Sequence, residues 1–484
     1  MGFLRYLAFL FLLLILLLPN VYGSGFTFDG LGVKARGMGG AFRAIADDWS
    51  AAYYNPAGYN RIKDNYLAAN LAIFHDRYWA KPNVLWNDTY EAGYYNNQDV
   101  ANSHEILNIP QGGIVFRLPV WGETVFGLSG LQLFDENHRW RLYNNLPGYG
   151  VADYPGTQFY NNLDVVAFQA TAARGFNNDK LSIGIGLQLL RADLIYSNLV
   201  LRDNGMASPL NDRPYDKIPE LYSNNGNGWG FGYRIGLLYD FTEKLTGALV
   251  YAGKSSIKID GSSAMNFYLG DNQYLIENLN IFPNTQEYLF ASGSTVHINA
   301  DFKTTLDIPA SFAGGLSYKL SNRLIVDADA EYIFWSQFKG LDFSYSNYRG
   351  LKDTSFHYAN DTLFTRNPSN PVDWKNTTRF MLGADYQALS FIDLRAGFGY
   401  DQSPVKTATF VPQFIDLGNK YSYSFGLGFT VGFWNMDLAM TYTHHPDLTV
   451  SGISDVNGDG IMDNLPGDYR ANYYQTVLGI SYRF

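Results

Sequence analysis

From Tyr66 to the C-terminus, the chain alternates between apolar residues and residues that are mostly polar or small. The C-terminal segment shows the pattern well, because its alternate positions carry Phe484, Tyr482, Ile480, Leu478, Thr476 and Tyr474. Successive side chains of a β-strand point to opposite faces, so each segment has one apolar face and one mostly polar face. The pattern therefore predicts an all-β chain.

Three features favour a membrane barrel over a soluble β-sandwich with the same alternation. The segments are roughly 10–13 residues long, whereas strands of soluble proteins usually have about 5–6 residues. Aromatic residues gather at their ends, as at the two lipid–water boundaries of a membrane barrel. Short turns, such as Thr242 to Lys244, alternate with long loops, such as Ser197 to Asn227 and Ser262 to Ser292. We therefore expect a transmembrane antiparallel β-barrel of about 14 strands, with its short turns on the periplasmic side.

Two details of the barrel follow from the same pattern. The stretch from Ser292 to Leu320 fits either one long strand or a strand with a bulged second piece. Asp327, Asp329 and Glu331 share one face of their strand. A charge that faces lipid at the midplane costs up to about 2–4 kcal/mol, so we expect these three carboxylates to face the lumen.

The stretch from Gly25 to Tyr59 does not alternate. It is rich in Gly and Ala and ends in Asn55, Pro56 and Ala57. Proline lacks an N–H and favours an extended residue before it, so this motif ends any helix formed by Asp47 to Tyr54. The motif is either a simple helix stop or a place where Asn55 hydrogen-bonds the barrel wall. We predict a hatch (residues 24–62) inside the lumen of a barrel formed by residues 63–484.

Met1 to Gly23 has the pattern of a secretory signal peptide. Arg5 is its positive residue, and Tyr6 to Leu18 is an apolar run that is too short to span a bilayer of about 30 Å. Cleavage is expected near Ser24, and an uncleaved membrane anchor is the alternative. A secreted chain agrees with a location in the outer membrane of a Gram-negative-type bacterium.

The composition narrows the function further. The chain has 484 residues, a net charge of −10 and no cysteine. Nucleic-acid binding needs clustered Lys and Arg, so no nucleic-acid partner is expected. The lack of cysteine excludes disulfides and zinc–thiolate sites. No G-x-S-x-G, H-E-x-x-H or phosphate-loop motif occurs, so we predict no enzyme, although a Ser–His pair on the barrel wall stays open as an alternative.

The segment from Asp455 to Asp463 matches the first half of an EF-hand-like calcium loop. Carboxylate and amide oxygens stand around a glycine turn, at Asp455, Asn457, Asp459 and Asp463. The twelfth position is Pro466 instead of Glu. The segment therefore predicts either a structural Ca²⁺ site in the last outer loop or a metal-free turn. No other cofactor is expected.

Short motifs near the N-terminus and in the middle of the chain resemble one protein family. The N-terminal motifs are Gly25-Phe26, Gly37-Met38-Gly39-Gly40-Ala41, Ala46-Asp47-Asp48 and Asn55-Pro56-Ala57. The central motifs are Ile308-Pro309-Ala310-Ser311, Gly314-Gly315 with Tyr318, and Asp327 and Trp335-Ser336 within Leu324 to Phe338. They resemble the FadL-like family of outer-membrane transporters for long-chain fatty acids and other hydrophobic compounds. The terminal Phe484 looks like the signal that the barrel-assembly machinery reads.

The resemblance implies a barrel of roughly fourteen strands with an N-terminal hatch. In that family the substrate enters from outside, binds apolar sites, meets the hatch and leaves through a lateral opening beside a kinked third strand. Here the third strand is Thr124 to Phe134, in which Gly127 and Gly130 permit a kink. Small residues without a bend are the alternative. The expected partners are fatty acids or other hydrophobic small molecules, and the lipids of the outer membrane.

Four residues are candidate ligand contacts. Phe26 and Phe28 alternate at the mature N-terminus, where they either touch an acyl chain or pack within the lumen. Arg36 and Arg43 either bind a carboxylate or pair with the acidic lumen. A rival hypothesis for the same fold is a barrel that serves as a binding partner in secretion or surface assembly through its long outer loops.

Overall fold

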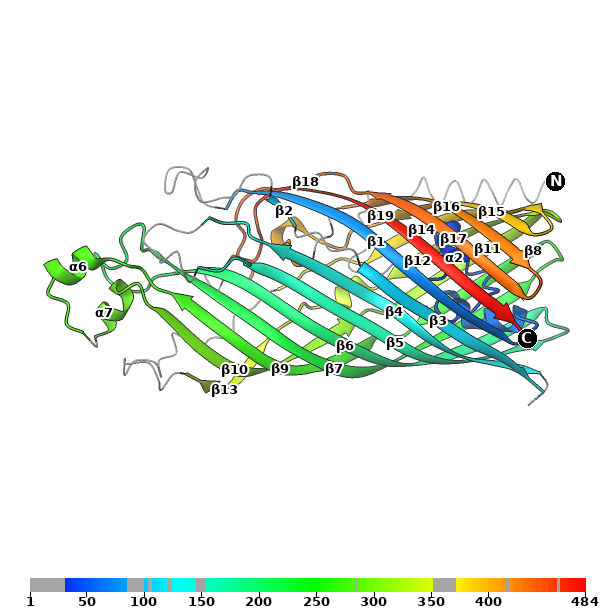
Figure 1. The fold of residues 1–484 in the computed structure, drawn as a ribbon, viewed down its shortest axis with the longest axis horizontal. Coiled ribbons are helices and arrows are strands. Elements are labelled where there is room, and N and C mark those ends of the chain that lie inside the picture. The colour runs from blue at the N-terminus through cyan, green and yellow to red at the C-terminus, as the bar shows by residue number, and fades with distance from the viewer. Residues whose placement is uncertain are drawn as a thin grey trace.

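The computed structural model describes residues 31–84, 100–102, 107–119, 123–144, 154–283, 285–350, 371–414, 416, 418–458 and 462–484, which form one closed β-barrel (Figure 1). β1 (Tyr66–Pro82) pairs with β19 (Gly467–Arg483) on one side and with β3 (Leu107–Leu118) on the other, so the sheet closes. Closure pairs the first and last strands, whose free edges would otherwise face lipid, where an unsatisfied backbone group costs several kcal/mol. The predicted antiparallel barrel of fourteen strands is confirmed.

The other strands follow one another around the barrel in chain order. They are β2 (Val100–Ala101), β4 (Thr124–Trp140), β5 (Phe159–Phe176), β6 (Leu181–Asp203), β7 (Lys217–Asp240), β8 (Leu245–Ala252), β9 (Ser255–Tyr268), β10 (Thr295–Ile308), β11 (Ser311–Ser321), β12 (Leu324–Ile333), β13 (Ser344–Arg349), β14 (Thr377–Leu389), β15 (Ile392–Asp401), β16 (Lys420–Val431), β17 (Trp434–His444) and β18 (Leu448–Val450). Pro309 and Ala310 separate β10 from β11, so the stretch from Ser292 to Leu320 contains an interrupted strand. Proline has no N–H to donate to the ladder, which explains the break.

The outer face of β7 shows the lipid-facing belt. Alternate residues from Trp229 on β7 to Phe241, directly after the strand, are all exposed, at 37–77% of their surface. These residues span about 40 Å along the strand and, at a tilt near 45°, about 28 Å along the membrane normal. That height fits the apolar thickness of an outer membrane. Aromatic residues stand at both ends of this belt, as the sequence predicts for a membrane barrel.

Several strands are longer than the sequence predicts. β6 has 23 residues and β7 has 24, so the connection predicted from Ser197 to Asn227 is mostly strand. Likewise, β9 continues to Tyr268, within the connection predicted from Ser262 to Ser292. The extra residues of β7 are rich in Asn, Ser and Gly and lie beyond Trp229, outside the lipid-facing belt. Because no lipid covers this part of the strand, it needs no apolar face, and period-two alternation of apolar residues does not mark it.

Short helices lie at both ends of the barrel and inside it. In chain order they are α2 (Val33–Gly37), α3 (Ala51–Tyr54), η1 (Pro56–Arg61), α6 (Gln273–Asn278), α7 (Gln286–Ala291), η2 (Trp335–Gln337) and η4 (Thr407–Thr409). α6 and α7 form the far tip of the outer loops, and α2 lies at the opposite end, near the C-terminus (Figure 1). Among the described residues, no helix has the length and apolar character to cross a membrane.

Residues 31–62 fill the end of the lumen that is bounded by the short turns. η1 packs against β4, β5, β6 and β7, and α2 packs against β15, β16 and β17 on the other side. These hatch residues and the inward faces of the strands share one buried apolar core. Phe26 and Phe28, like the predicted signal peptide (residues 1–23), lie outside the described residues. The domain boundaries at residues 23 and 62 stay predictions.

Candidate functional site

Asn55 joins the hatch to the barrel wall. Its side chain is fully buried, and its Nδ2 donates to the carbonyl oxygens of Arg43 (3.0 Å) and of Leu237 on β7 (3.1 Å). Its Oδ1 accepts a hydrogen bond from the Ala57 N–H at 3.1 Å, which caps the turn that Pro56 begins. A Cβ on Gly236 would lie 2.0 Å from the Asn55 Oδ1, so the wall has glycine at this contact. One side chain therefore holds three backbone groups of the hatch and the wall together.

Arg43 ties the hatch to the acidic strand β12. Its guanidinium lies 3.3 Å from Asp329 and 2.5 Å from Glu331, and both carboxylates are buried. The Asp329 Oδ2 also accepts hydrogen bonds from the backbone N–H groups of Phe42 (2.9 Å) and Arg43 (3.0 Å). Asp327, Asp329 and Glu331 thus face the lumen, which confirms that prediction. Arg36, the other arginine predicted as a ligand contact, donates from Nε to the Gln475 side chain.

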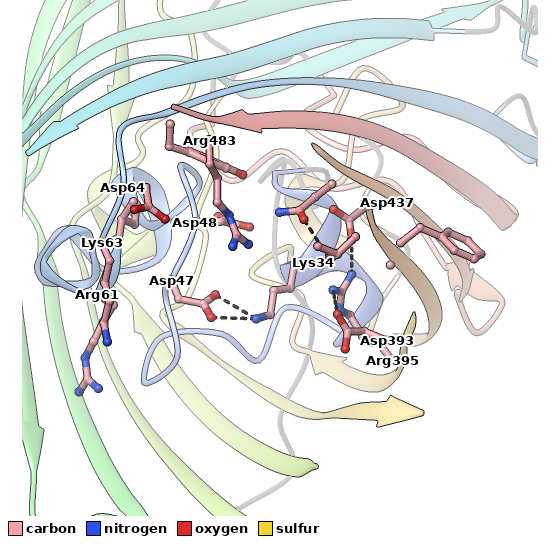
Figure 2. A pocket seen from close by; sticks show the side chains of 16 residues that line it. Lys34, Asp47, Asp48, Arg61, Lys63, Asp64, Asp393, Arg395, Asp437 and Arg483 are labelled. Atoms are coloured by element: carbon pink, nitrogen blue, oxygen red, sulfur yellow. Dashed lines mark hydrogen bonds and ion pairs between the residues drawn. The ribbon is translucent and has the colours of Figure 1, made fainter. Parts of the chain in front are cut away.

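A charged cavity of about 330 Å³ lies between the hatch and the barrel wall, at the end with the short turns (Figure 2). Lys34 pairs with Asp47 at 2.9 Å and with Asp385 at 3.4 Å, and Arg395 pairs with Asp437 at 2.6 Å. Burial alone would lower the pKa of Lys34, but Asp47 and Asp385 together raise it above its usual value. Such a lining suits water and ion pairs, so this cavity is no site for an apolar substrate.

A second, smaller cavity lies on the lumen side of the hatch and has a volume of about 50 Å³. Tyr53 of the hatch lines it, together with Leu133, Phe134, Leu190, Ile308 and Ile333 from the wall. Arg234 also lines it and stacks its guanidinium 4.2 Å from the centre of the Tyr53 ring. Within the described residues, the buried Arg234 Nε makes no hydrogen bond. Arg379 and the carboxylate of Glu331 line it as well, so the cavity combines an apolar wall with two cations and one carboxylate.

The ladder between β3 and β4 stops at the pair of Gly112 and Gly130. Both strands continue past this pair: β3 pairs with β1 as far as Leu107, and β4 pairs with β5 up to Trp140. The β4–β5 ladder also shifts its register between Gln132 and Phe134. β4 therefore leaves β3 at Gly130, and a bulge follows directly, as is common where a strand bends.

The two glycines of β4 have different surroundings. A Cβ on Gly127 would lie 2.4 Å from the ring of Tyr59 in the hatch, whereas a Cβ on Gly130 would meet no atom within 4 Å. The Tyr59 hydroxyl is also 2.9 Å from the Ser129 hydroxyl, within hydrogen-bond distance. Gly127 thus makes room for the hatch, and Gly130 leaves open space on the opposite face of the strand.

That open space is part of an apolar groove of about 670 Å³ on the outer side of the barrel. Its lining comes from four neighbouring strands and is mostly outward-facing: Leu128, Gly130, Phe168, Ala170, Leu187, Leu189 and Phe231. Three lumen-facing residues, Ser129, Gln169 and Gln188, also reach it. Gln188 lines both the groove and the lumen cavity above the hatch. Gln188 lies in β6, which is paired with β5 and with β7 at this residue, so the two spaces lie on opposite faces of the hydrogen-bonded wall.

A pair of glutamines connects the barrel wall at β5 and β6 to the hatch. The Gln188 Nε2 donates to the Gln169 Oε1 at 2.8 Å, and the Gln169 Nε2 donates to the Ala52 carbonyl of α3 at 2.7 Å. Both side chains are buried. A movement of α3 would break the bond to Gln169, so the position of the hatch is coupled to this pair of side chains. The sequence gives only a weak signal for this pair, namely two polar residues on the lumen faces of otherwise apolar strands.

The predicted calcium loop is only partly described. The Asp455 Oδ1 accepts a hydrogen bond from the Gly458 N–H, and the Asp463 Oδ2 accepts one from the Val456 N–H, each at 2.7 Å. Asp459 lies outside the described residues. In the part of the chain that is described, no three His, Asp or Glu side chains come together in a way that could hold a metal. Calcium binding by Asp455, Asn457, Asp459 and Asp463 stays a prediction.

Comparison with known proteins identifies a family and several relatives of this chain. The family described as "Outer membrane protein transport protein (OMPP1/FadL/TodX)" matches residues 23–484. The long-chain fatty acid transport protein of Escherichia coli K12 is 23% identical over 454 residues, which cover 88% of each chain. Matches to two relatives, from Neisseria meningitidis and Pasteurella multocida, cover 51% and 35% of those proteins.

Solved structures share the fold. A Pseudomonas aeruginosa FadL homologue superposes with a TM-score of 0.71 at 19% identity, over 95% of this chain and 100% of the other. The Pseudomonas putida toluene transporter TodX superposes with a TM-score of 0.66 at 16% identity, over 94% of this chain and 99% of the other. At these identities the likeness concerns the barrel fold.

Proposed function

The chain belongs to the OMPP1/FadL/TodX family of outer membrane transport proteins, and from this premise we propose that it carries long-chain fatty acids or other hydrophobic molecules through the barrel by diffusion. Family members transport fatty acids and hydrophobic aromatic compounds across the outer membrane. We propose transport as the whole activity of this chain, without a catalytic step. The substrate moves from the lumen cavity above the hatch to the wall at Gly130, leaves where the β3–β4 ladder ends, and passes over the outer groove into the membrane.

The single observation that carries this route is that the β3–β4 ladder ends at Gly130, and Gly130 borders the groove that faces lipid. A substrate that crosses there leaves one apolar surface for another, and each methylene that stays out of water preserves about 0.8 kcal/mol. A route through the charged cavity would expose the same methylenes to water. The hydrophobic effect therefore favours lateral release over release past the ion pairs.

Gly130 and the hatch act as the gate in this proposal. The unpaired stretch above Gly112 and Gly130 supplies a wall segment without a ladder to break. Asn55, Pro56 and Ala57 hold the hatch against β7, and the Tyr59 hydroxyl of the hatch contacts the Ser129 hydroxyl of β4. A small movement of the hatch thus frees β4 beside Gly130 and widens the passage.

The lumen cavity favours a substrate with an anionic head. Two cations, Arg234 and Arg379, and one carboxylate, Glu331, line it. Among the described residues, the buried Arg234 Nε makes no hydrogen bond, and its guanidinium lies against the Tyr53 ring. A guanidinium binds a carboxylate through charge-assisted hydrogen bonds. We therefore propose fatty acids ahead of uncharged aromatic hydrocarbons.

The test blocks the outer groove with a bulky side chain. Gly130→Phe places a ring in the open space around Gly130 without a clash, because a Cβ there meets nothing within 4 Å. Cells that carry the parental protein are expected to take up oleate, and cells with Gly130→Phe are expected to lose most of that uptake. Gly314→Phe is the matched control, since Gly314 lies in β11, on a distant part of the wall, with only ordinary contacts around its Cβ position. Equal uptake by both variants would contradict lateral release, and no uptake by the parental protein would contradict oleate transport.

A further inference from the structure

A connecting segment crosses the outer mouth of the barrel. Residues 404–414 follow β15 and lead back to β16, yet they reach the wall on the other side. Around the barrel, β5 is the fourth of the fourteen strands and β15 is the eleventh, so these two strands lie opposite each other. The segment therefore spans the whole width of the lumen, and we refer to residues 404–414 as the strap.

Hydrogen bonds fasten the strap to the opposite wall. The Gln413 Nε2 donates to the Ser197 carbonyl (3.2 Å) and to the Asn198 Oδ1 (3.0 Å) on β6. The Asn161 Nδ2 of β5 donates to the Gln413 carbonyl at 3.0 Å, and the Trp140 Nε1 of β4 donates to the Pro412 carbonyl at 3.1 Å. Gln413 is fully buried. These bonds concentrate at one end of the strap, so their loss would release that end.

Phe414 fills an aromatic pocket at this fastened end. Its ring lies 5.9 Å from Phe338, 6.2 Å from Tyr196 and 6.4 Å from Trp374, measured between ring centres. Phe338 and Trp374 also contact each other at 4.8 Å. Only 5% of the Phe414 surface is exposed. The pocket walls are aromatic faces and edges, which suit a hydrocarbon chain or another apolar ring.

The pocket lies next to the lumen cavity above the hatch. Ile333, at the end of β12, lines that cavity, and the chain continues directly into η2 and Phe338 of the pocket. Trp335 of η2 is fully buried and lies 5.1 Å from Trp374. A molecule that travels from outside to the lumen cavity therefore meets the strap and this aromatic cluster first.

We propose that the strap is a lid over the outer mouth, and that the pocket filled by Phe414 is the first binding site for the apolar part of the substrate. Phe414 acts as an internal substitute for the ligand, so an alkyl chain or apolar ring takes its place when the lid opens. Opening exchanges the hydrogen bonds of Gln413 for bonds to water, while the incoming ligand restores the apolar contacts of the pocket. This inference rests on the proposed transport function, which it extends to the outer side of the barrel.

Because the natural chain has no cysteine, two introduced thiols can be bridged without side reactions. Gln413→Cys with Asn198→Cys, joined by a short reducible dithiol crosslinker, fixes the strap across the lumen. Ser422→Cys with Thr443→Cys is the matched control, because these hydroxyls lie 2.9 Å apart on the adjacent strands β16 and β17 and a bridge there leaves the strap free. Oleate uptake is measured before crosslinking, after it, and after reduction.

If the strap is a lid, oleate uptake is lost when the strap is crosslinked and recovers after reduction. Oleate uptake does not change when the control pair is crosslinked. Uptake that persists with the strap crosslinked would overturn the lid while leaving the transport function intact. If the uncrosslinked parental protein takes up no oleate, the transport function itself fails. Ligand binding in the pocket is then tested by a measurement that does not depend on transport.

That second readout is direct binding to purified protein. Phe414→Ala vacates the pocket, and the apolar fluorophore N-phenyl-1-naphthylamine is expected to bind more tightly to this variant than to the parental protein. Phe410→Ala is the control, because Phe410 is equally buried in the strap but packs on Tyr469, 4.6 Å away, outside the pocket. Equal fluorophore binding by Phe414→Ala and the parental protein would overturn the pocket as a ligand site.

Discussion

Replacement of Asn55 by alanine tests how firmly the hatch is held. Asn55→Ala removes hydrogen bonds to the carbonyls of Arg43 and Leu237 and to the N–H of Ala57. Since Asn55 is fully buried, water does not readily replace these bonds while the hatch stays in place. The substitution thus removes one link to β7 and two links within the hatch, and it leaves the strands of the barrel unchanged.

The size of the effect follows from the number of groups that lose a partner. Each buried backbone group left without a hydrogen bond costs about 1 kcal/mol or somewhat more. Only the bond to Leu237 joins the hatch to the wall, since the other two lie within the hatch, so hatch docking loses about 1 kcal/mol. Because every 1.4 kcal/mol corresponds to a factor of ten, the undocked population of the hatch should rise roughly fivefold.

A reporter thiol measures that population. Ser50 is fully buried in the hatch, so Ser50→Cys reports undocking through its rate of reaction with a soluble maleimide. The labelling rate should rise roughly fivefold when Asn55→Ala is added. Asn266→Ala serves as the control, because the Asn266 side chain bonds to His297 between two wall strands, away from the hatch. A labelling rate that is the same with Asn55 and with alanine would refute the role of Asn55 as a hatch anchor.

Three further predictions concern the wall, the lumen and the last outer loop. Gly127→Ala should push the hatch out of place at a cost of about 1–3 kcal/mol, because its Cβ would overlap the Tyr59 ring; the same thiol assay checks this, and unaltered labelling would speak against it. Arg43→Met should lower the melting temperature of the purified barrel by removing the cation beside the buried Asp329 and leaving Glu331 with Arg379, 4.0 Å away, at a cost of about 3–5 kcal/mol; a melting temperature equal to that of the parental protein would contradict a stabilising ion pair. The loop from Asp455 to Asp463 should release or absorb heat when calcium is added in a calorimeter, and the absence of both heat and stabilisation would leave it a metal-free turn.

The sequence alone determined the architecture. Lipid on one side of each strand and a packed lumen on the other impose an alternation that is visible residue by residue. The same reasoning put Asp327, Asp329 and Glu331 inside, because a carboxylate in lipid is too costly. The alternation of apolar residues marks only the parts of the strands that face lipid. It therefore missed the outer parts of β6 and β7, whose two faces meet water or protein.

Only the tertiary structure decided which groups meet inside the barrel. The ladder between β3 and β4 ends at Gly130 because of the register of two strands, and no local pattern encodes that register. Gln169 and Gln188 lie on successive strands, but their link to Ala52 depends on how the hatch is seated. The strap is the clearest case, since Gln413 and Asn198 are 215 positions apart in the chain. Such contacts depend on closure of the whole barrel, which brings opposite walls within reach of one loop.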